Sequence, residues 1–163
     1  MSDVRPEWDY SLHAAWYRFR PNYAPTAIDQ VVDLVGAWRR PGFITADVGA
    51  GTGNLTLMLL ERRLAPVVAI EPNAAMRELG QQATTGQPAV WIVGTGEATG
   101  LADRAVDWFA MGSSFNTTRR DECLREARRT LRPGGWFTCM WNHRELERDP
   151  VQSEVEQIIR RHV

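Results

Sequence analysis

Residues Phe43 to Asn54 read Phe-Ile-Thr-Ala-Asp-Val-Gly-Ala-Gly-Thr-Gly-Asn, and the predicted fold is built around them. This stretch begins as a short apolar run of strand-forming residues and then places three glycines, Gly49, Gly51 and Gly53, within five positions. An apolar run that favours a helix follows from Leu55 to Leu64. Strand, glycine turn and helix together begin a nucleotide-binding βαβ unit, because glycine lets the chain turn sharply and lets a ligand approach the main chain.

The spacing of these glycines separates two kinds of ligand site. A dinucleotide fingerprint, G-x-G-x-x-G, requires glycine at position 54, where this chain has Asn54. A dinucleotide oxidoreductase is therefore a distant alternative. The pattern present is Asp47-x-Gly49-x-Gly51-x-Gly53. An ordinary strand-to-helix turn without a ligand is the other interpretation of the same residues.

Composition limits the classes of function. The 163 residues suit one domain with a core, and the formal net charge of −1 creates no field that would recruit nucleic acid or an anionic membrane. All nineteen basic residues are arginine, which excludes a P-loop lysine, a Schiff-base lysine and a pyridoxal phosphate anchor. Cys123 and Cys139 lie far apart, so two free thiols are favoured over a redox or metal role, and we expect no metal site.

The sequence also bears on location. No apolar run is long enough to span a bilayer, and the polar, acidic segment Met1–Tyr10 does not fit a signal peptide. A cytoplasmic location is the default expectation.

Alternation of apolar and helix-favouring segments predicts an α/β fold. Five strand–helix alternations require a doubly wound, Rossmann-like parallel sheet with helices on both faces. The predicted strands are the run from Phe43, then Pro66–Ile70, Ala89–Val93, Ala105–Met111 and Trp136–Trp141. Ligands bind at the carboxyl ends of such strands. Five loops rich in glycine or polar residues meet at that edge: Gly49–Gly53, Glu71, Thr95–Ala98, Gly112–Asn116 and Asn142–Arg144.

Residues 1–42 form a separate N-terminal region ahead of the domain 43–163. A helix is expected over Glu7–Phe19 and another over Pro25–Trp38. The first either covers one end of the sheet or, with Tyr17 and Arg20, acts as a lid over the site. An arginine can bind a carboxylate through two parallel hydrogen bonds.

Glu71 lies about twenty residues beyond the glycine turn, at the end of the second strand. In such folds an acid at this place accepts hydrogen bonds from ribose hydroxyls. A solvated strand end is the alternative interpretation, and the glycine turn before it favours the ribose role.

Together these residues resemble the class I S-adenosylmethionine (SAM) dependent methyltransferases, and among them the small-molecule branch called type 11, which includes trans-aconitate methyltransferase-like proteins. The resemblance runs from about Tyr17 to Pro150. The motifs that carry it are Tyr-x-x-Arg-Pro-x-Tyr of Tyr17–Tyr23, Asp47-Val-Gly-Ala-Gly-Thr-Gly53, Glu71-Pro-Asn-Ala-Ala-Met76, Gly94-Thr-Gly-Glu97, Asp107 and Leu131-Arg-Pro-Gly-Gly135.

The resemblance implies a cofactor, SAM, with S-adenosylhomocysteine (SAH) as its product. Asp47, Gly49 and Gly51 would border its methionyl part, and Arg20 would face its carboxylate. Glu71 would hold the ribose, Pro72 and Met76 would lie near the adenine, and Thr95, Gly96 and Glu97 would meet the adenine edge. Many relatives carry an acid or amide where Thr95 stands, which weakens that assignment and favours Glu97. Gly112 and Ser113 would line the sulfonium side; Tyr17, Ala50 and Asn54 complete the predicted set.

Methyl transfer demands little acid–base chemistry, because the cofactor carries the electrophile. His13 and His143 are the candidate bases, although a structural or solvent-facing role is favoured for each; Asn142 and Ser114 could orient an acceptor. The predicted function is methyl transfer to a small molecule. The alternative is a SAM-binding scaffold, a regulatory subunit or a methyl-independent catalyst on the same fold.

The resemblance also predicts where the sheet stops. The family's sheet usually has seven strands in the order 3-2-1-4-5-7-6, and this sequence supplies five before a helix over Val151–His162. Trp136–Trp141 would then be an open edge strand that can pair with another chain. We therefore expect a longer protein, self-association or a complementing chain.

Overall fold

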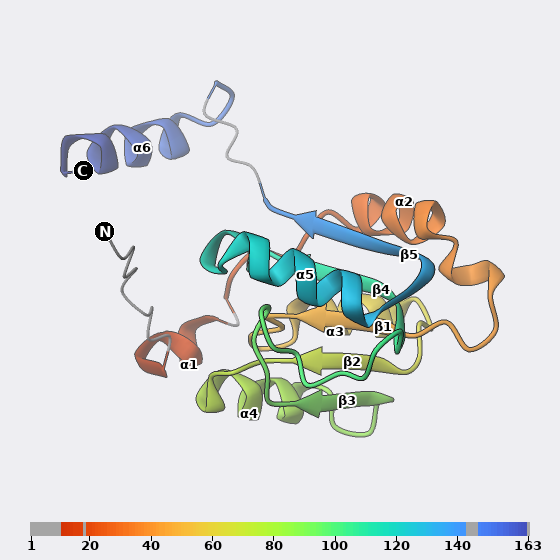
Figure 1. Cartoon of the computed structure of the whole chain (residues 1–163). Helices are drawn as coiled ribbons and strands as arrows, with labels where there is room; N and C mark the ends of the chain where they lie inside the picture. Colours follow the sequence, from red (N-terminus) through yellow and green to blue (C-terminus); the bar gives the residue numbers. More distant parts are fainter. Residues whose placement is uncertain (1–10, 18, 143–146, 163) are drawn as a thin grey trace.

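Five parallel strands form a single sheet in the order β3-β2-β1-β4-β5 (Figure 1). The computed structural model describes residues 11–17, 19–142 and 147–162. The chain moves outward from β1 to β3 and then crosses back to β4 on the other side of β1, so the strand order reverses between β1 and β4. Ligands bind at such a switch point. The strands are β1 Thr45–Val48, β2 Val67–Ile70, β3 Ala89–Ile92, β4 Val106–Gly112 and β5 Leu131–Met140.

Helices cover both faces of this sheet, which confirms the predicted fold class. Successive strand residues point to opposite faces. Trp108 therefore packs with α2 and α3, whereas Phe109 packs with α5. The helices are α1 Ala14–Tyr17, α2 Pro25–Val35, α3 Asn54–Glu61, α4 Ala74–Ala83, α5 Arg120–Thr130 and α6 Pro150–His162.

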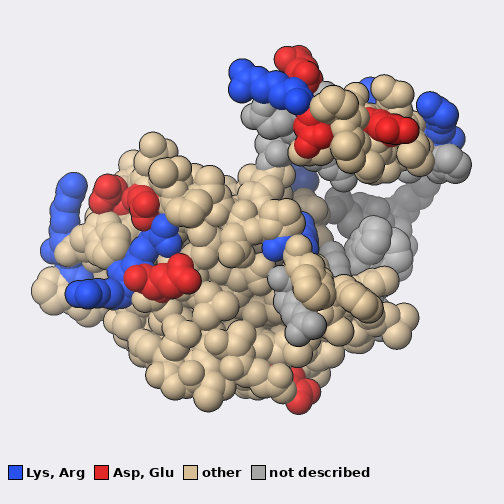
Figure 2. Space-filling view, turned by 180° about the vertical axis from the view of Figure 1, so that it is seen from behind, with Lys and Arg blue, Asp and Glu red and all other residues tan. Residues whose placement is uncertain are grey.

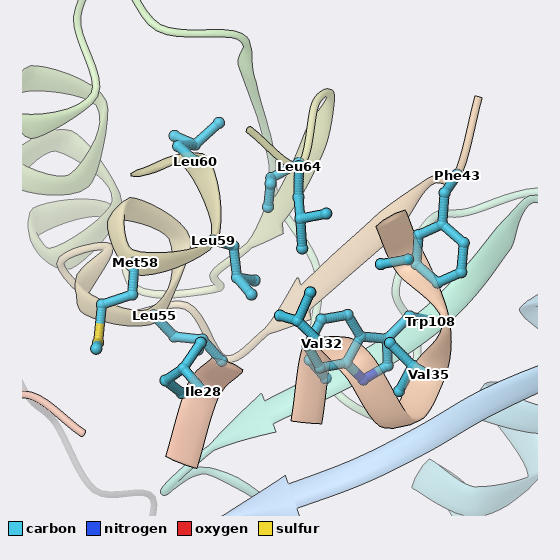
Figure 3. Packing of buried hydrophobic residues seen from close by; sticks show 13 residues of the cluster. Ile28, Val32, Val35, Phe43, Leu55, Met58, Leu59, Leu60, Leu64 and Trp108 are labelled. Atoms are coloured by element: carbon cyan, nitrogen blue, oxygen red, sulfur yellow. The ribbon is translucent and has the colours of Figure 1, made fainter. Parts of the chain in front are cut away.

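The core beneath α2 and α3 places the glycine turn. Ile28, Val32 and Val35 of α2 meet Leu55 and Leu59 of α3 (Figure 3). Trp108 closes the cluster from the strand below and is fully buried, and its indole N–H donates to Thr138 Oγ1 at 2.8 Å. This indole therefore buries its ring area without leaving a polar atom unpaired.

The amino ends of the strands are tied together by the buried carboxylate of Asp107. Its Oδ2 accepts from the Ile44 N–H at 2.9 Å and from Arg132 Nη1 at 2.7 Å, and Arg40 Nη1 lies 3.6 Å from its Oδ1. Asp107 thus joins the entry to β1 with the beginning of β5, at the edge opposite the predicted site.

Three predicted boundaries differ from the structure. The described part of the expected helix 7–19 is a 3-10 turn, Ser11–His13, followed by the short α1. The helix from Pro25 ends at Val35, because Gly36 takes a left-handed conformation with φ +69° that closes it. Strand β5 begins at Leu131 rather than Trp136, since the segment 132–135 bulges out between the two registers that pair β5 with β4.

Strand β5 is an edge strand and exposes apolar side chains. Trp136 is 38% exposed and Trp141, just beyond the strand, is 50% exposed. Helix α6 stands apart from the sheet in Figure 1 and exposes Val151, Val155, Ile158 and Ile159. Figure 2 shows charged side chains on α6 and at one end of the molecule, with only isolated charged side chains elsewhere on this face. Association through these apolar surfaces stays a prediction.

Among the described residues, no helix has both the length and the apolar character needed to cross a bilayer.

Candidate functional site

A cavity of about 50 Å³ lies where β1 and β4 end, at the switch point of the sheet. Nine of the predicted cofactor residues line it: Tyr17, Arg20, Asp47, Gly49, Ala50, Gly51, Asn54, Gly112 and Ser113. Pro21, Tyr23, Thr52, Leu55 and Asn142 complete its wall. The tertiary structure thus brings together residues from the N-terminal segment, the glycine turn and the ends of β4 and β5.

The glycine turn is held against β2 by its own backbone. The N–H groups of Gly49 and Ala50 both donate to the Ile70 carbonyl, at 2.8 and 3.0 Å. Gly49 has φ +73°, and a Cβ there would lie 2.5 Å from the Cβ of Ser114. No larger residue fits this turn, which explains why a glycine is required at position 49.

Glu71 contacts the glycine turn directly. Its Oε2 accepts from the Gly51 N–H at 2.8 Å and its Oε1 accepts from the Asn73 N–H at 2.9 Å. Burial raises the pKa of this carboxyl, and the two N–H donors act in the opposite direction. Each carboxylate oxygen has a further lone pair. Glu71 does not line the cavity, and its ribose role stays a prediction.

Asp47 is fully buried and only partly satisfied. Thr56 Oγ1 donates to its Oδ2 at 2.6 Å, but Oδ1 has no hydrogen-bond partner among the described residues. Burial raises the pKa of Asp47 to about 7, and the nearby Glu71 acts in the same direction. Sequence reasoning missed Thr56, whose only signal is a hydroxyl inside an otherwise apolar helix.

Replacing Asp47 by asparagine is expected to stabilise the protein at pH 8 more than at pH 4. The folded pKa lies above the unfolded value of 3.8, so folding favours the protonated acid. The stability linked to Asp47 is complete below about pH 4 and is lost as the pH rises through about 7. Urea unfolding of both proteins at the two pH values measures the difference. Equal differences at pH 4 and pH 8 would show that Asp47 is not perturbed.

Tyr17 and residues 19–23 lie at the carboxyl edge, where the lid is predicted. The Tyr23 hydroxyl is 2.9 Å from Ser113 Oγ, and Asn142 Nδ2 donates to the Pro21 carbonyl at 3.1 Å. Arg20 donates to the Tyr17 hydroxyl, and its guanidinium carbon lies 4.8 Å from the centre of the Tyr17 ring. Sequence reasoning saw Tyr23 as part of a motif and gave it no role.

The residues predicted near the adenine lie outside this cavity. Met76 is buried, Pro72 and Thr95 are exposed, and Gly96 packs against Thr118. Their contact with a cofactor stays a prediction. Glu97 Oε1 accepts from the Arg119 N–H at 2.7 Å. This carboxylate therefore holds the start of α5, and its adenine role stays a prediction.

The candidate bases do not gather at the cavity. His13 is exposed in the 3-10 turn and does not line it, and His143 lies outside the described residues. Ser114 Oγ donates to the Val48 carbonyl at 2.7 Å and so supports the strand end. Among the described residues, no group of three His, Cys, Asp or Glu side chains could hold a metal ion.

Comparison with known proteins identifies the fold and the family. Residues 46–139 match the methyltransferase domain family. An uncharacterized methyltransferase of Mycobacterium bovis is 37% identical over 151 residues, which make up 93% of this chain and 58% of that protein. The ubiquinone/menaquinone biosynthesis C-methyltransferase UbiE of Rubrivivax gelatinosus is 35% identical over 136 residues, or 80% of this chain and 47% of that protein.

This chain superimposes on a crystal structure from Methanococcus maripaludis, that of a protein provisionally identified as a SAM-dependent methyltransferase. The TM-score is 0.67 and the sequence identity 18%, and the superposition covers 84% of this chain and 63% of that chain. At this identity the similarity concerns the fold. This chain spans about half the length of the curated relatives it matches. It belongs to the methyltransferase domain family and has the Rossmann-like fold of the class I SAM-dependent methyltransferases.

Proposed function

We propose that this chain binds SAM and that the protein transfers the methyl group to a small-molecule acceptor. The observation that carries the proposal is the contact between Glu71 and the Gly51 N–H beside a cavity at the switch point. When bound, SAM supplies a methyl group that is already electrophilic, and the protein has only to orient the two reactants and exclude water.

The residues present fit such a ligand. The unpaired Oδ1 of Asp47 is a buried acceptor at the cavity, and Gly51 leaves open the space that a side chain would fill. Arg20 can bind the carboxylate of SAM, and Glu71 can accept from its ribose hydroxyls. A cavity of about 50 Å³ is small beside the roughly 300 Å³ or more of common ligand pockets. Binding therefore requires the lid residues Tyr17 and Arg20 to move outward.

The acceptor we favour is an aromatic ring of the quinone type. The named relative from Rubrivivax gelatinosus is a C-methyltransferase of ubiquinone and menaquinone biosynthesis, which motivates this class. A tricarboxylate such as trans-aconitate needs several cations, whereas Arg20 is the one cationic side chain among the described residues that line the cavity. The residues that line the cavity therefore do not support trans-aconitate as the acceptor.

SAM and SAH are expected to bind with micromolar dissociation constants, on the order of −8 kcal/mol. Isothermal titration calorimetry with each ligand measures this. The proposal is contradicted if both ligands give no heat of binding and no thermal stabilisation.

A SAM-binding scaffold or methyl-independent catalyst is the second candidate, because no ionisable base other than Asp47 and the two tyrosines lines the described cavity wall. Transfer of label from methyl-labelled SAM to 1,4-dihydroxynaphthalene or to metabolite extracts separates the two. Label in any product excludes the second candidate.

A further inference from the structure

Two hydroxyl groups from distant parts of the chain meet at the cavity wall. Tyr23 precedes α2, Ser113 follows β4, and their oxygens lie 2.9 Å apart. No other hydrogen bond of these two hydroxyls occurs within the described part of the chain. One hydroxyl donates to the other, so the second keeps its own O–H free. The pair therefore offers one free donor and several lone pairs to a ligand.

The backbone that holds this pair in place is strained at Ser113. Ser113 has φ +59°, a left-handed conformation that glycine adopts more easily, and its N–H donates to the Met140 carbonyl at 2.8 Å. Strained residues of this kind persist where neighbours over-determine them, and they cluster at functional sites. Gly112 is limited by space instead, because a Cβ there would lie 2.8 Å from the Tyr23 hydroxyl. Glycine at position 113 would adopt its backbone conformation with less strain. Compared with glycine, serine adds a hydroxyl group.

Most of the wall around the pair is uncharged. Arg20 and Asp47 are the charged side chains among the described lining residues, and Arg20 is engaged with Tyr17. Burial raises the pKa of Tyr23, which keeps its phenol protonated at neutral pH. Leu55 adds an apolar surface to the same wall.

We propose that the hydroxyls of Tyr23 and Ser113 bind a neutral oxygen group, a hydroxyl or a carbonyl, of the methyl acceptor. The proposal rests on the proposed function and names the recognition element for its acceptor. Phe19 and Trp141 are 65% and 50% exposed, and each is adjacent in sequence to a lining residue, Arg20 or Asn142. These rings provide apolar surface for the body of an aromatic acceptor.

The test uses the full 163-residue chain saturated with SAH and titrated with 1,4-dihydroxynaphthalene under argon. Loss of one hydrogen bond of about 1.4 kcal/mol corresponds to roughly tenfold weaker binding. We expect this loss for Tyr23→Phe, with the affinity for SAH within about threefold of wild type. Ser113→Gly is the sharper variant: it removes the hydroxyl and also the strain, so we expect roughly tenfold weaker probe binding without lower thermal stability. Thr85→Ala, which removes an exposed hydroxyl at the end of α4, is the matched control.

The outcomes separate this proposal from the proposed function. Absence of SAH binding contradicts the proposed function, and the acceptor subsite falls with it. Normal SAH binding without probe binding contradicts the subsite alone. Wild-type probe affinity in both Tyr23→Phe and Ser113→Gly also contradicts it, as does tighter binding of citrate than of 1,4-dihydroxynaphthalene. Weaker probe binding in both variants supports it, with the retained SAH affinity of Tyr23→Phe showing that the cofactor site is intact.

Discussion

Replacing Glu71 by alanine is expected to weaken SAH binding by about 1–3 kcal/mol, roughly fivefold to 150-fold. The ribose hydroxyls would lose a charged acceptor. The same change leaves the N–H groups of Gly51 and Asn73 without the carboxylate they now contact at 2.8 and 2.9 Å. We therefore also expect the free energy of unfolding to fall by about 2 kcal/mol. Calorimetry measures the first effect and urea unfolding the second.

Two further variants separate charge from structure. Glu71→Gln keeps an oxygen that can accept from Gly51 and removes the charge, so it should recover part of the stability and little of the affinity. Glu78→Ala changes an exposed acid on α4 and should leave both quantities unchanged. If Glu71→Ala binds SAH as tightly as the wild type does, Glu71 is a structural residue and the ribose assignment is wrong.

Replacing Glu126 by alanine is expected to lower the free energy of unfolding by about 3 kcal/mol, the largest effect on stability that we expect. This buried carboxylate accepts from the Thr99 N–H at 2.8 Å and the Thr99 hydroxyl at 2.5 Å, and Arg129 Nε donates to it at 2.8 Å. Its removal leaves the buried Thr99 groups unpaired. Because Arg129 is partly exposed, water can solvate its charge after the substitution. The expected loss of stability therefore lies at the lower end of the range of about 3–5 kcal/mol for a broken buried ion pair.

The effect of Glu126 should depend on pH. Hydrogen bonds from Arg129, and after them those from Thr99, lower its pKa from 4.5 to about 2. The stability it contributes is therefore complete above about pH 4.5 and is lost as the pH falls toward 2. Urea unfolding of the wild type and Glu126→Ala at pH 6 and pH 3 measures this, and the difference between them should shrink at pH 3. The same difference at both values would mean that the carboxylate is not the origin of the stability.

Local patterns in the sequence predicted the architecture because they depend on near neighbours. Three glycines after a short apolar run require a sharp turn at the end of a strand, and the structure has φ +73° at Gly49 and φ +58° at Gly51. Alternation of strands and helices permits few topologies, since crossovers are right-handed. The order β3-β2-β1-β4-β5 followed from this alternation and from the resemblance to the class I methyltransferases. Because β1 and β2 are parallel neighbours in that order, Gly51 and Glu71, which follow them, were predicted to lie at the same carboxyl edge of the sheet.

Boundaries were less certain than the elements themselves. The Pro-Gly-Gly segment after α5 reads as the end of a helix, yet β5 already begins at Leu131. The segment 132–135 bulges between two registers with β4, and Asp107 Oδ2 holds Arg132 across this bulge at 2.7 Å. Pairing between strands, rather than local preference, decided where the strand starts.

The glycine turn, the parallel sheet and the edge at which ligands bind could all be predicted from the chain alone, since each follows from spacing within one segment or from the order of segments. Only the tertiary structure decided which side chains meet there. Tyr23 reaches Ser113 across 90 positions, Thr56 supports Asp47 from the next helix, and Glu97 accepts a hydrogen bond from the start of α5. The physical reason is that contacts between distant residues depend on sheet register and on how the helices pack, and no local pattern in the chain records either.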